Sequence, residues 1–201
     1  MLEEAAQAKV YNDIAEHFNQ TRHALWPGVL EFLQEIPAQS TILDLGCGNG
    51  KYLSVRADDC VIHGCDTCDP LLDIARGIHP HSHLIHADAR ALPYKDATFD
   101  AVISIALLHH LDTDGRQRAI SEIMRVLKPN GRFLITVWAM EAIKPKWTLL
   151  GNNDYMVPWH NKITNKNHDR HYHIHTEEEA KQLIPDTSIS WERDNWYIKR
   201  S

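Results

Sequence analysis

The run Leu43-Asp44-Leu45-Gly46-Cys47-Gly48-Asn49-Gly50 continues an apolar, strand-like segment that begins at Thr41. A strand that leads into glycines lets the backbone turn sharply and approach a ligand closely. Asp66 ends the next apolar run about twenty positions later, where a carboxylate can accept hydrogen bonds from a ribose diol. The pattern favours a nucleotide-type cofactor site over the alternative, a glycine turn with no ligand.

Short apolar segments alternate with amphipathic ones through the middle of the chain. We expect strands at residues 41–45, 60–66, 83–87, 99–105 and 132–138, and helices at residues 52–57, 70–78 and 112–127. This alternation predicts a parallel sheet covered by helices on both faces, which is a doubly wound α/β fold. In such sheets ligands bind beyond the carboxyl ends of the strands, where the glycine run lies.

Both ends of the chain differ from this repeat. Apolar side chains at helical spacing in residues 4–18, and a second helix expected from Pro27, make residues 1–37 or so a helical extension. Near the other end, a helix from Thr176 precedes two strand-like runs, residues 188–193 and 196–200. A short polar turn between two such runs predicts a hairpin.

Length and charge limit the possible functions. The 201 residues suit one domain, and no change of composition marks a boundary within residues 1–201. With 27 acids and 21 bases, the net charge of −6 disfavours nucleic-acid binding by the surface as a whole. Residues 144–170 contain more bases than acids, so they form either a local patch for a polyanion or a solvated loop with scattered lysines.

The sequence has no pattern typical of a targeting or membrane segment. The first residues carry neither a basic lead nor an apolar core, and no run approaches the roughly 18 apolar residues that cross a bilayer. We therefore expect a soluble, cytoplasmic protein without a membrane partner.

The four cysteines lie close together in the sequence, at Cys47, Cys60, Cys65 and Cys68. Cys65 and Cys68 have C-x-x-C spacing, but a structural zinc site needs two more ligands at suitable positions. We expect these side chains to be small core or pocket-wall groups, and we expect no metal site in this chain.

The glycine run departs from the dinucleotide fingerprint G-x-G-x-x-G, because Gly50 comes one residue early and Lys51 occupies the expected position. The string from Asp44 to Gly50 resembles motif I of the class I S-adenosylmethionine-dependent methyltransferases. That resemblance implies a Rossmann-like, seven-stranded, mostly parallel sheet with an antiparallel C-terminal hairpin. It also implies S-adenosyl-L-methionine as the cofactor and S-adenosyl-L-homocysteine as its product.

The same resemblance assigns the cofactor contacts. Asp66 is expected to bind the ribose hydroxyls, with helix capping as the alternative, while Asp69 is expected to be the cap. Asp88 would take the adenine amino group and the Ala89 amide a ring nitrogen. The implied cofactor residues are Asp44, Gly46, Cys47, Gly48, Asn49, Gly50, Asp66, Thr67, Asp88, Ala89 and Ile105.

Four further segments carry a narrower resemblance. They are residues 11–27 with Gln20-Thr21-Arg22, the pair His109-His110, Val157-Pro158-Trp159-His160, and Arg170-His171-Tyr172-His173 with Asp194-Asn195-Trp196-Tyr197. In this order they resemble the eukaryotic transfer-RNA wobble-uridine carboxymethyl methyltransferases over nearly the whole chain. The resemblance implies methyl esterification of 5-carboxymethyluridine in the anticodon loop of tRNA.

A carboxylate is already ionised near neutral pH, so this reaction needs no general base and depends on positioning and on exclusion of water. Arg22 is the candidate for holding the carboxylate, with a surface ion pair as the alternative. One histidine of the His109-His110 pair should face the substrate while the other packs. Aromatic side chains commonly stack on extruded bases, although Trp159 has a core role as its alternative. The candidates at the acceptor site are Arg22, His109, His110, Trp159, His160 and His173.

The resemblance also implies a partner, because family members work with a small zinc-binding activator subunit. Residues 83–87 would form an exposed edge strand, which invites addition of a partner at this edge, so we expect a heterodimer with the zinc on the activator's side. The family usually has a longer insertion between positions equivalent to Trp138 and Trp159, so this chain is either compact or shortened. The alternatives are a small-molecule class I methyltransferase and a non-catalytic methyltransferase-like subunit.

Overall fold

The computed structural model describes residues 2–200, and for residues 2–6 it describes the backbone alone. Its largest element is a seven-stranded sheet with the order β3-β2-β1-β4-β5-β10-β9. These strands are β1 (Thr41–Leu45), β2 (Val61–Asp66), β3 (His83–His86), β4 (Phe99–Ile105), β5 (Leu127–Trp138), β9 (Ser188–Glu192) and β10 (Asn195–Arg200). Neighbours among β1 to β5 pair in parallel, whereas β10 is antiparallel to both β5 and β9. The predicted doubly wound sheet with an antiparallel terminal hairpin is confirmed.

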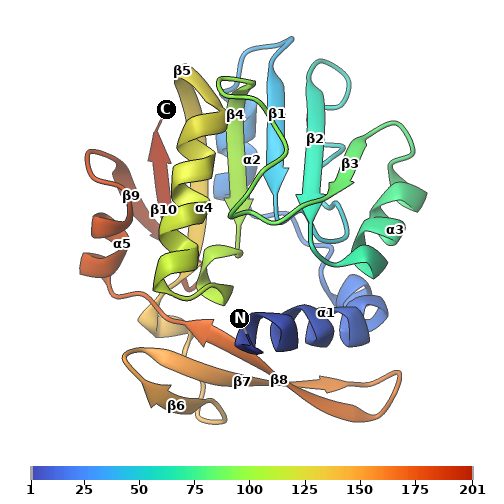
Figure 1. Cartoon of the computed structure of the whole chain (residues 1–201), viewed down its shortest axis with the longest axis vertical. Helices are drawn as coiled ribbons and strands as arrows, with labels where there is room; N and C mark the ends of the chain where they lie inside the picture. Colours follow the sequence, from blue (N-terminus) through green and yellow to red (C-terminus); the bar gives the residue numbers. More distant parts are fainter. Residues whose placement is uncertain (1, 201) are drawn as a thin grey trace.

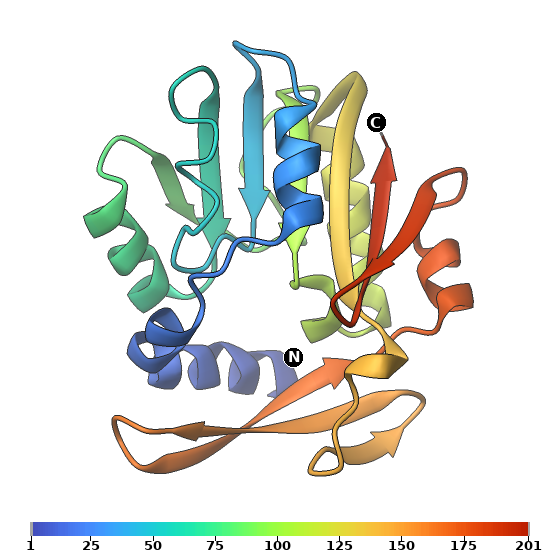
Figure 2. The ribbon, with the colours of Figure 1, turned by 180° about the vertical axis from the view of Figure 1, so that it is seen from behind.

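Helices cover both faces of this sheet (Figures 1 and 2). Helix α2 (Pro27–Gln34) lies on one face, and helices α4 (Thr113–Val126) and α5 (Glu177–Leu183) lie on the other. Ile42 packs in the same cluster as Phe32 of α2, whereas its neighbour Leu43 packs in the cluster that contains Ile123 of α4. Adjacent residues of β1 thus serve opposite faces, as the alternation of side chains along a strand requires.

The terminal hairpin has a tight turn at the predicted place. Arg193 and Asp194, between β9 and β10, have φ values of 50° and 64°. Two consecutive residues with positive φ are typical of a type I′ turn, whose twist matches that of the flanking strands.

A second sheet, which the sequence did not predict, lies beyond the carboxyl ends of the main strands (Figure 1). It consists of β6 (Thr148–Gly151), β7 (Asp154–Asn161) and β8 (Lys166–His173), all antiparallel. Helix α1 (Leu2–Thr21) runs between the two sheets. The interpretation of residues 144–170 as a solvated loop is therefore wrong for most of this segment.

Two local predictions are also wrong. Residues 52–57 form successive turns rather than a helix, with backbone bonds such as Leu53 N to Gly50 O at 3.0 Å that span three residues instead of four. Asp69 does not cap helix α3 (Asp69–Ile78), because it is the first helical residue and the cap position is held by Cys68. The Asp69 carboxylate instead pairs with His86 Nδ1 at 2.8 Å.

Three smaller features complete the fold. Short 3-10 turns η1 (Leu108–His110) and η2 (Met140–Ala142) follow β4 and β5. All four cysteines are free and buried, as expected. None of the helices within residues 2–200 has the length and apolarity needed to cross a bilayer.

Candidate functional site

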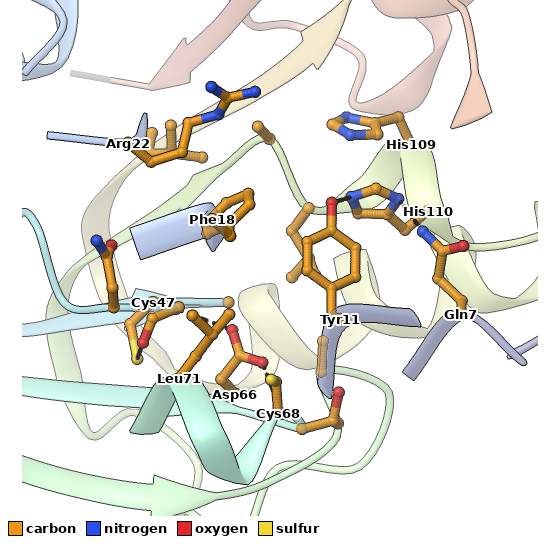
Figure 3. Close-up of a pocket in the computed structure, with 18 of the residues that line it drawn as sticks. Gln7, Tyr11, Phe18, Arg22, Cys47, Asp66, Cys68, Leu71, His109 and His110 are labelled. Carbon is orange, nitrogen blue, oxygen red and sulfur yellow. Dashed lines mark hydrogen bonds between the residues drawn. The ribbon is translucent and has the colours of Figure 1, made fainter. Parts of the chain in front are cut away.

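A cavity of about 550 Å³ lies where β1, β2 and β4 end, and side chains from α1 and β8 also line it (Figure 3). Cavities that bind small molecules commonly measure about 300–1,000 Å³. Ten of the eleven residues expected to bind a cofactor line this cavity, namely Asp44, Gly46, Cys47, Gly48, Asn49, Asp66, Thr67, Asp88, Ala89 and Ile105.

The glycine loop forms one wall. Gly46 and Gly48 have φ values of 76° and 53°, which side chains disfavour, and a Cβ at Gly46 would lie 3.0 Å from Leu107 Cδ2. Gly50 has a different role from the predicted cofactor contact. Its φ is 79° and a Cβ there would lie 2.7 Å from Leu53 Cδ1, so this glycine permits packing against the following turns and does not line the cavity.

Asp44 is a buried carboxylate with spare hydrogen-bonding capacity. It is 2% exposed, and its Oδ2 has no partner among the described side chains. Burial raises the pKa of Asp44 to about 7, an effect that the charge of Lys51 opposes. A buried acceptor without a donor is costly, so this side chain is suited to receive a donor from a ligand.

Asp66 organises the loop around it. Its Oδ2 accepts a hydrogen bond from Gly48 N at 2.9 Å, and its Oδ1 accepts one from Cys68 N at 2.9 Å. Burial raises the pKa of Asp66, while hydrogen bonds from the backbone amides of Cys68, Gly48 and Thr67 oppose that shift. Each carboxylate oxygen accepts more than one hydrogen bond, so capacity remains for a ligand hydroxyl.

Asp88 and Lys51 add two charged groups to the cavity wall. Asp88 forms a two-pronged pair with Arg90, at 2.9 Å to Nε and 2.5 Å to Nη2. The Lys51 ammonium lies 4.8 Å from the ring centres of both Trp26 and Tyr52, and burial lowers the pKa of Lys51 to about 8.

His110 is held by hydrogen-bond partners at both ring nitrogens (Figure 3). Gln7 Nε2 lies 2.8 Å from His110 Nδ1, and the Gln7 side-chain oxygen accepts a bond from His171 N at 3.1 Å. The His171 carbonyl oxygen also lies 3.3 Å from Nδ1, while Tyr11 Oη lies 2.9 Å from Nε2. Each nitrogen thus has a protein partner in either neutral tautomer.

His109 has the packing role that was expected for one member of the pair, although it too touches the cavity. It is buried, its Nδ1 has no partner in the described part of the chain, and its ring centre lies 4.6 Å from that of Tyr172. Burial lowers the pKa of His109 far below its usual value and that of His110 to about 3, so both rings are neutral.

Arg22, predicted to hold the carboxylate, lines the cavity beyond the end of α1. Its guanidinium lies over the rings of Phe18 and Trp159, at 5.5 and 5.1 Å, and it donates a hydrogen bond to the Thr21 carbonyl. No carboxylate within residues 7–200 pairs with it, so the surface ion pair proposed as an alternative does not form among these side chains.

The remaining candidates lie behind or outside the cavity wall. Trp159 is buried against Phe18, which agrees with its core alternative. His160 is exposed and bonds to Asn167, because alternate residues of β7 point to opposite faces. His173 is held by Asp154 at 2.8 Å and does not line the cavity. The structure thus does not bring His160 and His173 to the site.

Several lining residues were missed by the sequence reasoning. Tyr11 and Phe18 belong to the apolar face of α1 and were interpreted as packing, while Gln7, a polar residue on that face, was the available signal. Arg170 was counted in a basic patch and in the motif that ends at His173 but was not proposed as a site residue, yet it too lines the cavity. Within residues 7–200, no group of histidine, cysteine, aspartate and glutamate side chains has the arrangement to hold a metal ion.

Comparison with known proteins agrees with this geometry. Residues 43–135 match a methyltransferase domain family. A tRNA (carboxymethyluridine(34)-5-O)-methyltransferase from Arabidopsis thaliana is 47% identical over 75% of this chain and 38% of its own length. The protein of that name from Saccharomyces cerevisiae is 44% identical over 75% of this chain and 55% of its own length. The chain therefore spans about half, or less, of these relatives.

Solved structures with little sequence identity share the fold. DhpI in complex with S-adenosylhomocysteine has a TM-score of 0.74 at 15% identity, covering 98% of this chain and 95% of its own. A putative methyltransferase complexed with the Haloferax volcanii Trm112 activator has a TM-score of 0.62 at 20% identity, covering 92% and 76%. The chain has a class I methyltransferase fold and is a homologue of the tRNA (carboxymethyluridine(34)-5-O)-methyltransferases.

Proposed function

We propose that this chain transfers a methyl group from S-adenosylmethionine to the carboxylate of 5-carboxymethyluridine at the wobble position of tRNA. The glycine loop, the unpartnered Oδ2 of Asp44 and the free positions on Asp66 fit this cofactor. When bound, the cofactor supplies an electrophilic methyl group and leaves as S-adenosylhomocysteine. Asp88 and Ala89, at the end of β3, are the groups proposed to hold its adenine.

One observation carries the choice of acceptor. Arg22 is a guanidinium in the same cavity as the glycine loop, and no carboxylate within residues 7–200 neutralises it. Figure 3 draws Arg22 and Asp66 on opposite sides of the cavity, so these two residues mark two ends of one site. An acceptor with its own carboxylate complements the basic end.

The residues present suit a reaction that needs no general base. Burial lowers the pKa of His110 to about 3, and both of its ring nitrogens already have protein partners, so His110 is not positioned to remove a proton from the substrate. An ionised carboxylate needs no such help. Its oxygen forms a bond to the methyl carbon as the bond from that carbon to sulfur breaks, which yields the ester and S-adenosylhomocysteine. The protein contributes alignment and exclusion of water.

The second sheet is the proposed contact for the anticodon arm. Lys146, Lys162 and Lys166 are exposed on it or in its loops, and none has a carboxylate partner within residues 7–200. Lys144 is instead within 3.5 Å of Asp194. Lysines at this surface would bind phosphate groups of the RNA without contacting the bases.

A small activator subunit is proposed to cover the β3 edge. β3 is the terminal strand of the main sheet, and nearby Val61 and Ile78 are apolar side chains with 47% and 55% of their surface exposed. Paired substitutions Val61→Lys and Ile78→Lys should weaken complex formation with a zinc-binding activator in co-expression. Unchanged co-purification of the variant would place the activator elsewhere.

The proposed activity is tested by methyl transfer from tritiated S-adenosylmethionine to bulk tRNA with the activator present. The label should enter RNA and be released by mild alkali, because methyl esters hydrolyse there. Label that resists alkali, or label that never enters RNA, would contradict the proposal.

A further inference from the structure

Arg170, in β8, is a buried arginine without an anionic partner among the described side chains. It is 5% exposed, its Nε makes no hydrogen bond, and it lines the cavity. No carboxylate within residues 7–200 lies at ion-pair distance from it. Arginine is seldom buried this completely without a carboxylate, since removing its charge from water is costly.

Arg170 and Arg22 both lie against the ring of Trp159. The Arg170 guanidinium carbon lies 4.7 Å from the centre of the Trp159 ring and 5.0 Å from that of Tyr172. The Arg22 guanidinium carbon lies 5.1 Å from Trp159. Cation–π contacts of this kind hold each guanidinium against a ring without using its N–H groups.

Two guanidinium groups of like charge in one cavity destabilise each other. Burial lowers the pKa of Arg22, and the charge of Arg170 lowers it further. Asp44, Asp66 and Asp88 lie in the same cavity but belong to the ends of β1, β2 and β3, and none of them pairs with either arginine. An anion bound between the arginines would relieve both groups at once.

We infer that Arg170 and Arg22 together form a two-arginine carboxylate site, which rests on the proposed function and makes the charge of the acceptor its recognition element. Arg22 has the predicted clamp role, and Arg170 supplies a second fork for the same anion. Neutral groups of similar shape, such as a carbamoylmethyl substituent, lack the charge that the pair requires.

This site has a consequence for turnover. Esterification replaces a carboxylate by a neutral ester, so the product loses its attraction to both arginines at the moment it forms. The site therefore favours binding of the substrate and release of the product. Methyl transfer itself thus lowers the affinity for the product.

The test uses two synthetic anticodon stem-loops that differ only in 5-carboxymethyluridine or 5-carbamoylmethyluridine at the wobble position. Binding is measured with S-adenosylhomocysteine and the activator present, so that no turnover occurs. The wild-type protein should prefer the charged RNA by about 10-fold or more, and Arg170→Gln should lose most of that preference. Affinity for the neutral RNA should stay within about twofold.

Two further variants sharpen the result. Arg200→Gln is the matched control, because Arg200 stacks on Phe133 at 5.2 Å but does not line the cavity, and it should keep the full preference. Arg170→Lys keeps the charge without the fork and should recover part of it. An unchanged preference in Arg170→Gln, or no preference in an active wild-type enzyme, would overturn the inference. Absence of methyl transfer by the wild-type enzyme would instead refute the proposed function.

Discussion

The hydroxyl of Tyr11 and Nε2 of His110 form a hydrogen bond of 2.9 Å between helix α1 and the segment that follows β4. Gln7 adds a second bond, to Nδ1 of the same ring, and a third to the backbone of β8. Asn49 of the glycine loop bonds to Asn19 near the other end of α1 at 2.9 Å. Hydrogen bonds thus hold helix α1 at both ends across the cavity. His110 contacts α1, and it also lies within hydrogen-bond distance of the backbone of β8.

Removal of the Tyr11 hydroxyl should weaken the contact between helix α1 and His110. Tyr11→Phe leaves the buried Nε2 of His110 without its hydrogen-bond partner and should lower the free energy of unfolding by about 1–2 kcal/mol. Tyr94→Phe is the matched control, because the buried Tyr94 hydroxyl has no partner within residues 7–200 to lose. Urea denaturation of both variants checks this. Equal losses of stability in the two variants would mean that the Tyr11 bond contributes nothing specific.

Asp66 should matter for the cofactor and not for the acceptor. Asp66→Ala removes the carboxylate that accepts a bond from Gly48 and is proposed to bind the ribose, so the dissociation constant for S-adenosylhomocysteine should rise by about 10- to 100-fold. Isothermal titration calorimetry measures it. Asp69→Ala removes a neighbouring carboxylate that pairs with the exposed side chain of His86, and it should bind the cofactor normally. A normal affinity in Asp66→Ala would remove this residue from the site.

Arg22 should act on the acceptor and not on the cofactor. Arg22→Gln deletes a charged hydrogen-bond donor, so kcat/KM for tRNA should fall by about 10- to 100-fold while cofactor affinity stays unchanged. Arg22→Lys should recover only part of the rate, because a lysine lacks the planar fork. Initial rates at saturating cofactor provide the measurement, and full turnover by Arg22→Gln would exclude the clamp.

Buried histidines should make the fold sensitive to acid. His175 is 1% exposed and burial lowers its pKa to about 2, so the unfolded chain binds a proton below about pH 6.5 that the folded chain does not. The free energy of unfolding therefore falls as pH falls, and His175 accounts for a loss of about 2 kcal/mol at pH 5. Asp44, whose pKa burial raises to about 7, acts in the opposite direction.

A comparison of variants isolates the histidine. Between pH 7.5 and 5, His175→Gln should lose less unfolding free energy than the wild-type protein. The control His81→Gln, at an exposed position, should show the same dependence of unfolding free energy on pH as the wild-type protein. Urea midpoints across this range give the slopes. Identical slopes for His175→Gln and the wild-type protein would show that His175 is protonated in the folded state.

The cofactor half of the cavity could be predicted from the sequence because its signals are local. The glycine run from Asp44 and the carboxylates at strand ends have meaning within a few residues of each strand. Parallel strands bring their carboxyl ends to one edge, so the order of the strands along the chain is enough to place Asp44, Asp66 and Asp88 together. The same reasoning failed for Gly50, whose neighbour Leu53 belongs to turns that looked helical.

The part of the cavity proposed for the acceptor, near Arg22 and Arg170, depends on contacts that the sequence does not display. β7 and β8 contain histidines, aspartates and Arg170 in place of an apolar run, so they did not read as strands. Side chains alternate along β7, so Trp159 points inward and His160 points outward. Both were expected at the acceptor site because they are neighbours in one motif. A buried arginine resembles a surface base in a count of charges, and stacking on Trp159 is visible only in three dimensions.

The most direct test of the account uses the stem-loop with a single 5-carboxymethyluridine, the activator and unlabelled S-adenosylmethionine, followed by mass spectrometry of the nucleosides. The account predicts that 5-carboxymethyluridine is converted to its methyl ester, and that the matched RNA with uridine at the wobble position stays unchanged. Methylation of any other nucleoside, or recovery of unmodified 5-carboxymethyluridine after prolonged incubation, would contradict it.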